Sequence, residues 1–122
     1  MSDQSIESEI QAKGLTAPRV TPADIEAEIA SEHYFTADDG VNGSSGDRVR
    51  YGTGHPLGLL TFCVLVLRNG FTVTGESACA SPENFDAEIG RKIARENAIE
   101  KIWPLLGFRL RDDLTARGAV QA

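Results

Sequence analysis

The chain has 122 residues, of which 41% are hydrophobic, so it has room for one domain with a small core. Its formal net charge of −6 is uneven, because residues 1–40 carry nine acidic and two basic groups whereas residues 81–122 carry seven of each. An acidic chain without a basic stripe argues against binding of duplex nucleic acid, and no run approaches the roughly 18 apolar residues of a membrane span.

The N-terminus and the cysteines indicate where the protein works. Residues 1–5 are polar and acidic and lack the layout of a signal peptide, which predicts a cytoplasmic protein with reduced cysteines. Two cysteines are too few for a metal site, and His33 and His55 have no ligand-like spacing to them. We therefore expect no metal and no cofactor.

The first predicted element is a short N-terminal helix. Residues 1–20 are expected to be flexible, and Thr21 and Pro22 then supply a cap and a favourable first helical residue. Isoleucines one turn apart follow, and the segment ends at Phe35 in an aromatic cluster that would anchor the helix to the rest of the domain.

A glycine-rich loop is predicted at residues 36–56. It is long for a connection without secondary structure, so it is either functional or disordered. No Gly-Lys-Ser/Thr follows the glycines, so the tract does not indicate a phosphate loop. The single α+β domain is expected to span residues 21–114, with a flexible tail at 115–122.

The dipeptide Asn69-Gly70 predicts a β-hairpin between Leu59–Arg68 and Phe71–Cys79, since Asn-Gly favours a two-residue type I′ turn. That turn would pair Arg68 with Phe71. It would also gather one apolar core face from both strands: Leu60, Phe62, Val64, Val66, Phe71, Val73 and Cys79. The second face is half apolar and would be covered by a helix or a second subunit. In this register Cys63 and Cys79 lie on opposite faces, which argues against a disulfide between them.

A long C-terminal helix is predicted next. It would begin near Pro82 or Phe85 and run to Trp103, with Pro104 ending it. Residues 105–111 would then form a short strand or turn. The apolar residues cover more than one stripe of this helix, which favours packing against its own sheet and against another subunit. We therefore expect a homo-oligomer, a dimer or higher.

The sequence contains no recognisable catalytic set, so we expect a binding protein rather than an enzyme. Arg91 and Arg95 lie four residues apart, so their guanidinium groups can reach one volume and suit paired phosphates. The alternative is two surface arginines paired with Glu88 and Glu96. Polar and aromatic residues near the strand-to-helix junction could hold a base, although capping and core packing explain them too: Thr74, Ser77, Asn84 and Phe85.

The chain also resembles two known groups of phage proteins. The stretch from Asn69-Gly70-Phe71 through Ser81-Pro82-Glu83-Asn84-Phe85-Asp86 to Ala98 resembles the phage gene-product-49/gene-66 family over about residues 20–111. The hairpin and the Arg-bearing helix are also similar to phage proteins that counter Thoeris immunity. Those proteins are oligomeric sponges that hold a cyclic ADP-ribose signal, or a cyclic oligonucleotide, without cleaving it. This second resemblance implies that Arg91 and Arg95 contact phosphates.

The leading hypothesis is therefore a phage anti-defence protein that sequesters a cyclic nucleotide signal in the cytoplasm of an infected bacterium. One alternative is a module that inhibits a host protein through its acidic N-terminal region. Another is a small structural phage protein.

Overall fold

The computed structural model describes residues 2–45 and 54–122, which divide into two compact units. One unit comprises residues 29–101, and the other comprises residues 1–28 together with 102–122. Helix α4 (Ala87–Ala116) runs through both units. The fold class is the predicted one, α+β with an antiparallel sheet, a long C-terminal helix and a short N-terminal helix. The oligomeric state and the domain limits stay predictions.

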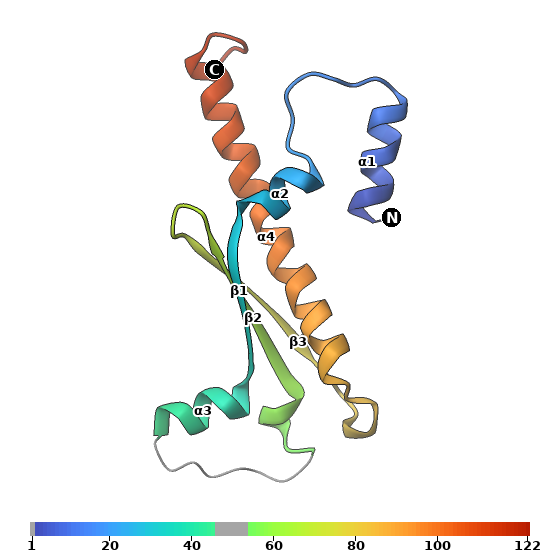
Figure 1. The fold of residues 1–122 in the computed structure, drawn as a ribbon, viewed down its shortest axis with the longest axis vertical. Coiled ribbons are helices and arrows are strands. Elements are labelled where there is room, and N and C mark those ends of the chain that lie inside the picture. Colours follow the sequence, from blue (N-terminus) through green and yellow to red (C-terminus); the bar gives the residue numbers. More distant parts are fainter. Residues whose placement is uncertain (1, 46–53) are drawn as a thin grey trace. The chain divides into compact units, whose positions relative to one another are not determined.

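The unit of residues 29–101 is built on a three-stranded antiparallel sheet in the order β1-β2-β3 (Figure 1). The first half of α4 packs on one face of this sheet. Helix α3 and two 3₁₀ turns, η1 and η2, complete the unit. Its elements before α4 are β1 (Ile29–Thr36), α3 (Ala37–Ser45), η1 (Pro56–Leu59), β2 (Leu60–Leu67), β3 (Thr72–Ala78) and η2 (Pro82–Asn84).

The predicted hairpin exists, but its register was wrong by one residue. The Gly70 N–H donates to the Leu67 carbonyl (2.9 Å), and the Leu67 N–H donates to the Phe71 carbonyl (2.8 Å). Three residues therefore form the loop instead of two, with Gly70 in the left-handed region at φ +87°. The Asn69 side chain accepts from the Phe71 N–H and stabilises this longer turn.

The register shift changes which residues of β2 and β3 share a face, because side chains alternate along a strand. Val73 pairs with Leu65, and Gly75 pairs with Cys63. These residues lie under α4 and are buried, so the core face includes the odd-numbered residues of β2. The even-numbered residues of β2, predicted as the core face, are only half-buried and lie beside Thr72, Thr74, Glu76 and Ala78.

Two segments differ from their predicted structure. The helix predicted from Thr21 spans Pro22–Glu28, and Ile29–Thr36 form strand β1, which pairs with β2. Within the predicted loop, Ala37–Ser45 form α3, because the side chains of Thr36 and Asp39 cap each other's backbone N–H groups at its start. Part of the loop prediction, residues 46–53, lies outside the described residues.

The unit of residues 1–28 and 102–122 contains α1 (Asp3–Ala12), α2 (Pro22–Glu28) and the second half of α4. Its buried apolar residues are Ile25, Ile102 and Leu106. The Arg19 guanidinium forms two hydrogen bonds with the Glu7 carboxylate, at 2.5 and 2.8 Å. α1 occupies part of the segment expected to be flexible, and its flexibility stays a prediction.

The prediction that Pro104 ends the long helix was wrong, as was that of a strand or turn at residues 105–111. α4 continues through the proline to Ala116. A proline inside a helix leaves one carbonyl of the preceding turn without its helical partner, but flanking turns can maintain the helix. In the described ranges, no helix is both long and apolar enough to cross a membrane.

Candidate functional site

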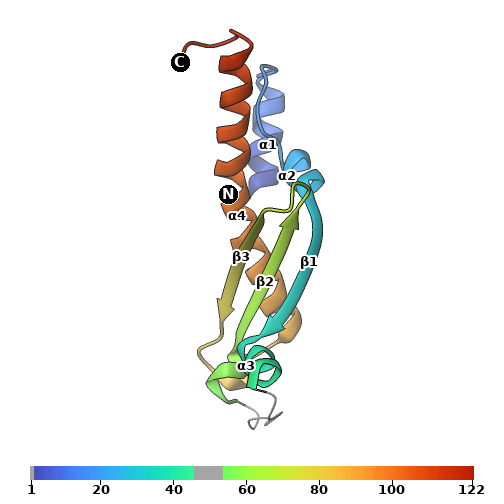
Figure 2. The same ribbon diagram turned by 90° about the vertical axis from the view of Figure 1, so that its left-hand side faces the viewer.

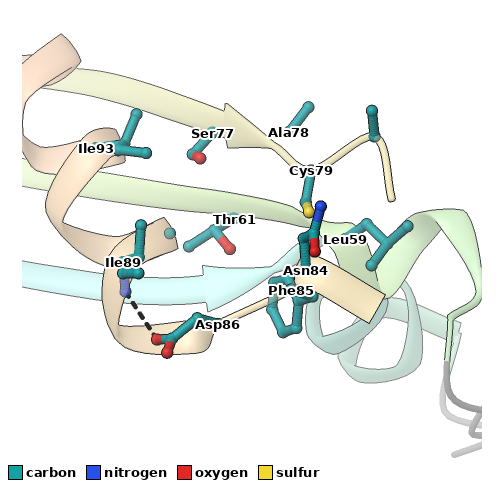
Figure 3. Close-up of a pocket in the computed structure, with 12 residues that line it drawn as sticks. Leu59, Thr61, Ser77, Ala78, Cys79, Asn84, Phe85, Asp86, Ile89 and Ile93 are labelled. Atoms are coloured by element: carbon teal, nitrogen blue, oxygen red, sulfur yellow. Dashed lines mark hydrogen bonds between the residues drawn. The ribbon is translucent and has the colours of Figure 1, made fainter. Parts of the chain in front are cut away.

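A pocket lies where the beginning of β2 and the end of β3 meet the beginning of α4 (Figure 3). Its volume is about 270 Å³. Apolar walls come from Leu59, Phe85, Ile89 and Ile93, and Cys79 lies at the end of β3. This size is just below the roughly 300–1,000 Å³ of pockets that hold drug-sized ligands. The pocket can therefore hold a small, largely apolar group.

Local hydrogen bonds position the polar rim of this pocket. One carboxylate oxygen of Asp86 accepts from the backbone N–H groups of Glu88 (2.9 Å) and Ile89 (3.1 Å), which caps the start of α4. The second of these bonds is drawn in Figure 3. The Cys79 thiol donates to the Ser81 carbonyl at 3.1 Å. The side chains around the pocket entrance are thus held by the chain's own backbone.

Thr61 provides the most buried polar group of the pocket. The residue is only 3% exposed, and its side chain lines the pocket. Gly90 leaves room for it, because a Cβ at that position would lie 3.1 Å from the Thr61 oxygen. Thr61 can therefore offer its hydroxyl to a group that enters the pocket.

The electrostatics of the pocket disfavour an anion. Its lining contains the Asp86 carboxylate and neither a lysine nor an arginine. A phosphate placed there would lose water without gaining a cationic partner. Within one chain, the pocket therefore suits an uncharged group.

Arg95 lies outside this lining, in a network that joins α4 to β1. Its Nε donates to Glu32 Oε2 at 2.9 Å, and the Tyr34 hydroxyl donates to Glu32 Oε1 at 3.2 Å. Burial, together with the nearby Cys63 and Glu32, raises the pKa of Tyr34 to about 12. Burial also raises the pKa of the Cys63 thiol, which is fully enclosed. Both groups are therefore protonated at neutral pH, and Cys63 is not a nucleophile.

Arg91 lies one helical turn before Arg95 and is exposed. No ion pair to Arg91 occurs in residues 2–45 and 54–122. The neighbouring Lys92 instead pairs with Glu88 at 3.5 Å. Since residues four apart share one side of a helix, the two arginines border the same surface of α4.

The five residues singled out from the sequence do not form one cluster within the chain. Asn84 and Phe85 line the pocket, whereas Arg91 and Arg95 do not. Thr74 lies on the face of the sheet that α4 leaves open, beside Glu76. Reasoning from the sequence missed Thr61 and Glu32. Side chains alternate along a strand, so the hairpin register and the existence of β1 would have placed both residues on the side of the sheet that faces α4.

Comparison with known proteins gives one match. The model of the family described as "Phage protein (N4 Gp49/phage Sf6 gene 66) family" matches residues 20–114, which is most of the chain. No curated protein and no solved structure matches the chain significantly.

Proposed function

The chain belongs to the phage protein family of N4 Gp49 and phage Sf6 gene 66, and we propose that it sequesters a small, phosphate-bearing cyclic nucleotide without cleaving it. The family match supports a phage origin, and the ligand is our inference. Such a protein needs tight binding and slow release, and it needs no group that stabilises a transition state. It would act inside the infected bacterial cell.

The observation that carries the proposal is the pair Arg91 and Arg95 on one side of α4. Arg91 is exposed, and Arg95 is held one turn away by Glu32. Guanidinium groups bind phosphate oxygens with two parallel hydrogen bonds, so neighbouring arginines suit a ligand that carries two phosphates. The acidic remainder of the chain, at a net charge of −6, would repel bulk nucleic acid.

The positions of the five candidate residues favour a site shared between copies. The pocket with Asn84 and Phe85 contains no cation, and Thr74 lies on the other face of the sheet. A ligand that uses arginines, the aromatic ring and Thr74 together would therefore need side chains from more than one chain. This requirement agrees with the homo-oligomer predicted from the sequence.

Native mass spectrometry of the full chain tests the proposal directly. We would mix the protein with isomers of cyclic ADP-ribose and with cyclic di- and trinucleotides. We expect a stoichiometric complex from which heating releases the ligand intact. A cleaved ligand would show an enzyme, and the absence of any adduct would contradict the proposal.

Charge reversal at Arg91 then tests the site. Arg91→Glu removes an exposed cation without breaking an ion pair in the described structure, so it should abolish ligand binding and leave the fold intact. Arg95→Gln should weaken binding, with some loss of stability because Glu32 loses its partner. Lys92→Glu is the matched control, since it changes the charge of the same helix by the same amount. Equal binding by Arg91→Glu and Lys92→Glu would exclude the arginine site.

A second candidate is a module that inhibits a host protein through its acidic N-terminal region. Asp3, Glu9, Asp24 and Glu26 are exposed in that region, which favours a basic partner surface. The double variant Arg91→Glu with Arg95→Glu should leave such an inhibitor active. Loss of activity in the double variant would therefore speak against this candidate.

A further inference from the structure

An acidic side chain lies directly against one of the two arginines of α4. Strand β1 forms one edge of the sheet, and in Figure 2 the first half of α4 passes behind the strands. Glu32 and Tyr34 are two residues apart on β1, so their side chains lie on the same face. The ion pair of Glu32 with Arg95 shows that this is the face towards α4. A ligand bound by Arg95 therefore meets the Glu32 carboxylate as well.

Both oxygens of the Glu32 carboxylate are held by other side chains. Arg95 Nε donates to Oε2 at 2.9 Å, and the Tyr34 hydroxyl donates to Oε1 at 3.2 Å. The hydroxyl keeps its proton at neutral pH, because burial, Cys63 and Glu32 raise the pKa of Tyr34 to about 12. The negative charge of Glu32 is therefore fixed in position beside Arg95.

This ion pair is accessible from solvent. The side chain of Glu32 is 43% exposed and that of Arg95 is 27% exposed. Arg91, one helical turn before Arg95, is exposed too. An anionic ligand can therefore reach the arginines, but it binds next to a fixed carboxylate.

Nucleotides differ in the charge that each phosphate carries. A phosphodiester, as in a cyclic nucleotide, carries one negative charge, whereas a terminal phosphate monoester carries about −1.5 to −2 at neutral pH. A linear nucleotide such as ATP thus brings more negative charge to the same arginines. Since Coulomb repulsion grows with the charge of the ligand, a nearby carboxylate disfavours ATP more than a cyclic nucleotide. Repulsive groups of this kind give specificity by weakening the wrong complex.

We propose that Glu32 determines the specificity of the arginine pair, by excluding nucleotides with terminal phosphates, such as ATP, while allowing ligands whose phosphates are diesters. This inference rests on the proposed function, since it takes Arg91 and Arg95 as the groups that bind phosphate. Tyr34 is a positioning residue, because it acts on the ligand only through Glu32. Without this repulsion, the abundant ATP of a cell would compete for the arginines.

Isothermal titration calorimetry of the full chain with ATP, in buffer without magnesium, tests the proposal. The wild type should bind ATP weakly. Glu32→Gln keeps the size of the side chain and an oxygen that can accept from Arg95, but it removes the charge. This variant should therefore bind ATP at least about tenfold more tightly. Adding Arg91→Glu to Glu32→Gln should abolish the gain, which would assign it to the arginine pair.

Matched variants separate a local effect of Glu32 from other causes. Glu76→Gln removes the same charge from β3 on the opposite face of the sheet, so it should leave the affinity for ATP unchanged. Glu32→Asp retains the negative charge and should still exclude ATP. Tyr34→Phe releases one oxygen of Glu32 and should give a smaller gain in ATP affinity than Glu32→Gln. Circular dichroism checks that each variant folds.

The result with ATP is read independently of the result with cyclic nucleotides. An unchanged affinity for ATP in Glu32→Gln, or an equal gain in Glu76→Gln, would overturn this inference even where a cyclic nucleotide binds as proposed. Tight binding of ATP by the wild type would overturn it too. A gain that depends on Arg91, in a protein that binds no cyclic nucleotide, would support the role of Glu32 and contradict the proposed ligand.

Discussion

Gly75 allows the sheet and α4 to come into backbone contact. A Cβ at this position would lie 2.1 Å from the Ala94 carbonyl oxygen and 2.3 Å from the Ala98 nitrogen. Both neighbours are backbone atoms of a helix, so neither can move without displacing the whole segment. Ala94 and Ala98 are themselves fully buried, and small residues on both sides therefore set the separation of the two layers.

Gly75→Ala should consequently destabilise the protein by about 3 kcal/mol or more, the upper range of overpacking. Urea unfolding at neutral pH measures the effect. Gly107→Ala is the control, because Gly107 is in α4 with no atom within 4 Å of its added Cβ. That exchange should stabilise the helix by up to about 1 kcal/mol. Similar midpoints for the two variants would contradict the close packing of β3 on α4.

Individual residues also show how far the sequence allowed prediction. Asn69-Gly70 identified the hairpin, but the same dipeptide fits a two-residue turn or a three-residue loop with a left-handed glycine. In the structure Leu67 bonds with both Gly70 and Phe71, which makes the three-residue loop, and that single shift changed which residues form the core face. Local turn chemistry could not decide this, because Asn-Gly suits both kinds of turn.

Helices and strands were predictable where a helix-capping residue and a clear periodicity of apolar residues agreed. Thr21 caps the start of α2 as predicted, and Asp24 accepts from the Thr21 N–H in return. The beginning of α4 is close to its predicted position. The helical spacing of Ile25 and Ile29 predicted that the helix continues into β1, yet pairing with β2 outweighed that preference. Pro104 predicts a helix end because proline has no N–H to donate. The flanking turns nevertheless keep Pro104 inside α4.

Replacing this proline should therefore strengthen α4. Pro104→Ala restores an N–H to the helix and should raise the free energy of unfolding by about 1–3 kcal/mol, since proline in a helix interior costs about 3 kcal/mol relative to alanine. Thermal unfolding followed by circular dichroism measures it. Lys101→Ala, an exposed exchange in the same helix, should change stability by less than about 0.5 kcal/mol. A lower unfolding temperature for Pro104→Ala than for the wild type would show that the fold depends on the local distortion of α4 at Pro104.

At the scale of the whole molecule, the two units differ in what holds them together. The unit of residues 29–101 has a sheet core, whereas the other unit has few buried apolar residues and contains the ion pairs of Glu7 with Arg19 and of Glu28 with Arg109. The hydrogen bonds from Arg19 and from Gln11 lower the pKa of Glu7 from 4.5 to about 2. No pattern in the sequence indicates this pairing of Glu7 with Arg19, twelve residues away.

Acid should therefore weaken the unit of residues 1–28 and 102–122. The depressed pKa of Glu7 means that its stabilising contribution is complete above pH 4.5 and is lost as pH falls towards 2. Trp103, the single tryptophan, lies in this unit and donates to Asp3, so its fluorescence reports on the unit. The urea midpoint should fall more between pH 6 and pH 3 in the wild type than in Arg19→Gln. Equal falls of the urea midpoint in the two proteins would contradict a stabilising role for the pair of Glu7 and Arg19.

The order of the two units along the chain has a consequence for synthesis. The unit of residues 29–101 is an insertion within the other unit, whose parts lie at both ends of the chain. During translation the sheet and its half of α4 are complete before the second half of α4 is made. Helices α1 and α2 are translated before this unit's part of α4, which supplies the buried residues Ile102 and Leu106 beside the buried Ile25 of α2. Residues 1–28 can thus complete their unit only after residues 102–122 are made.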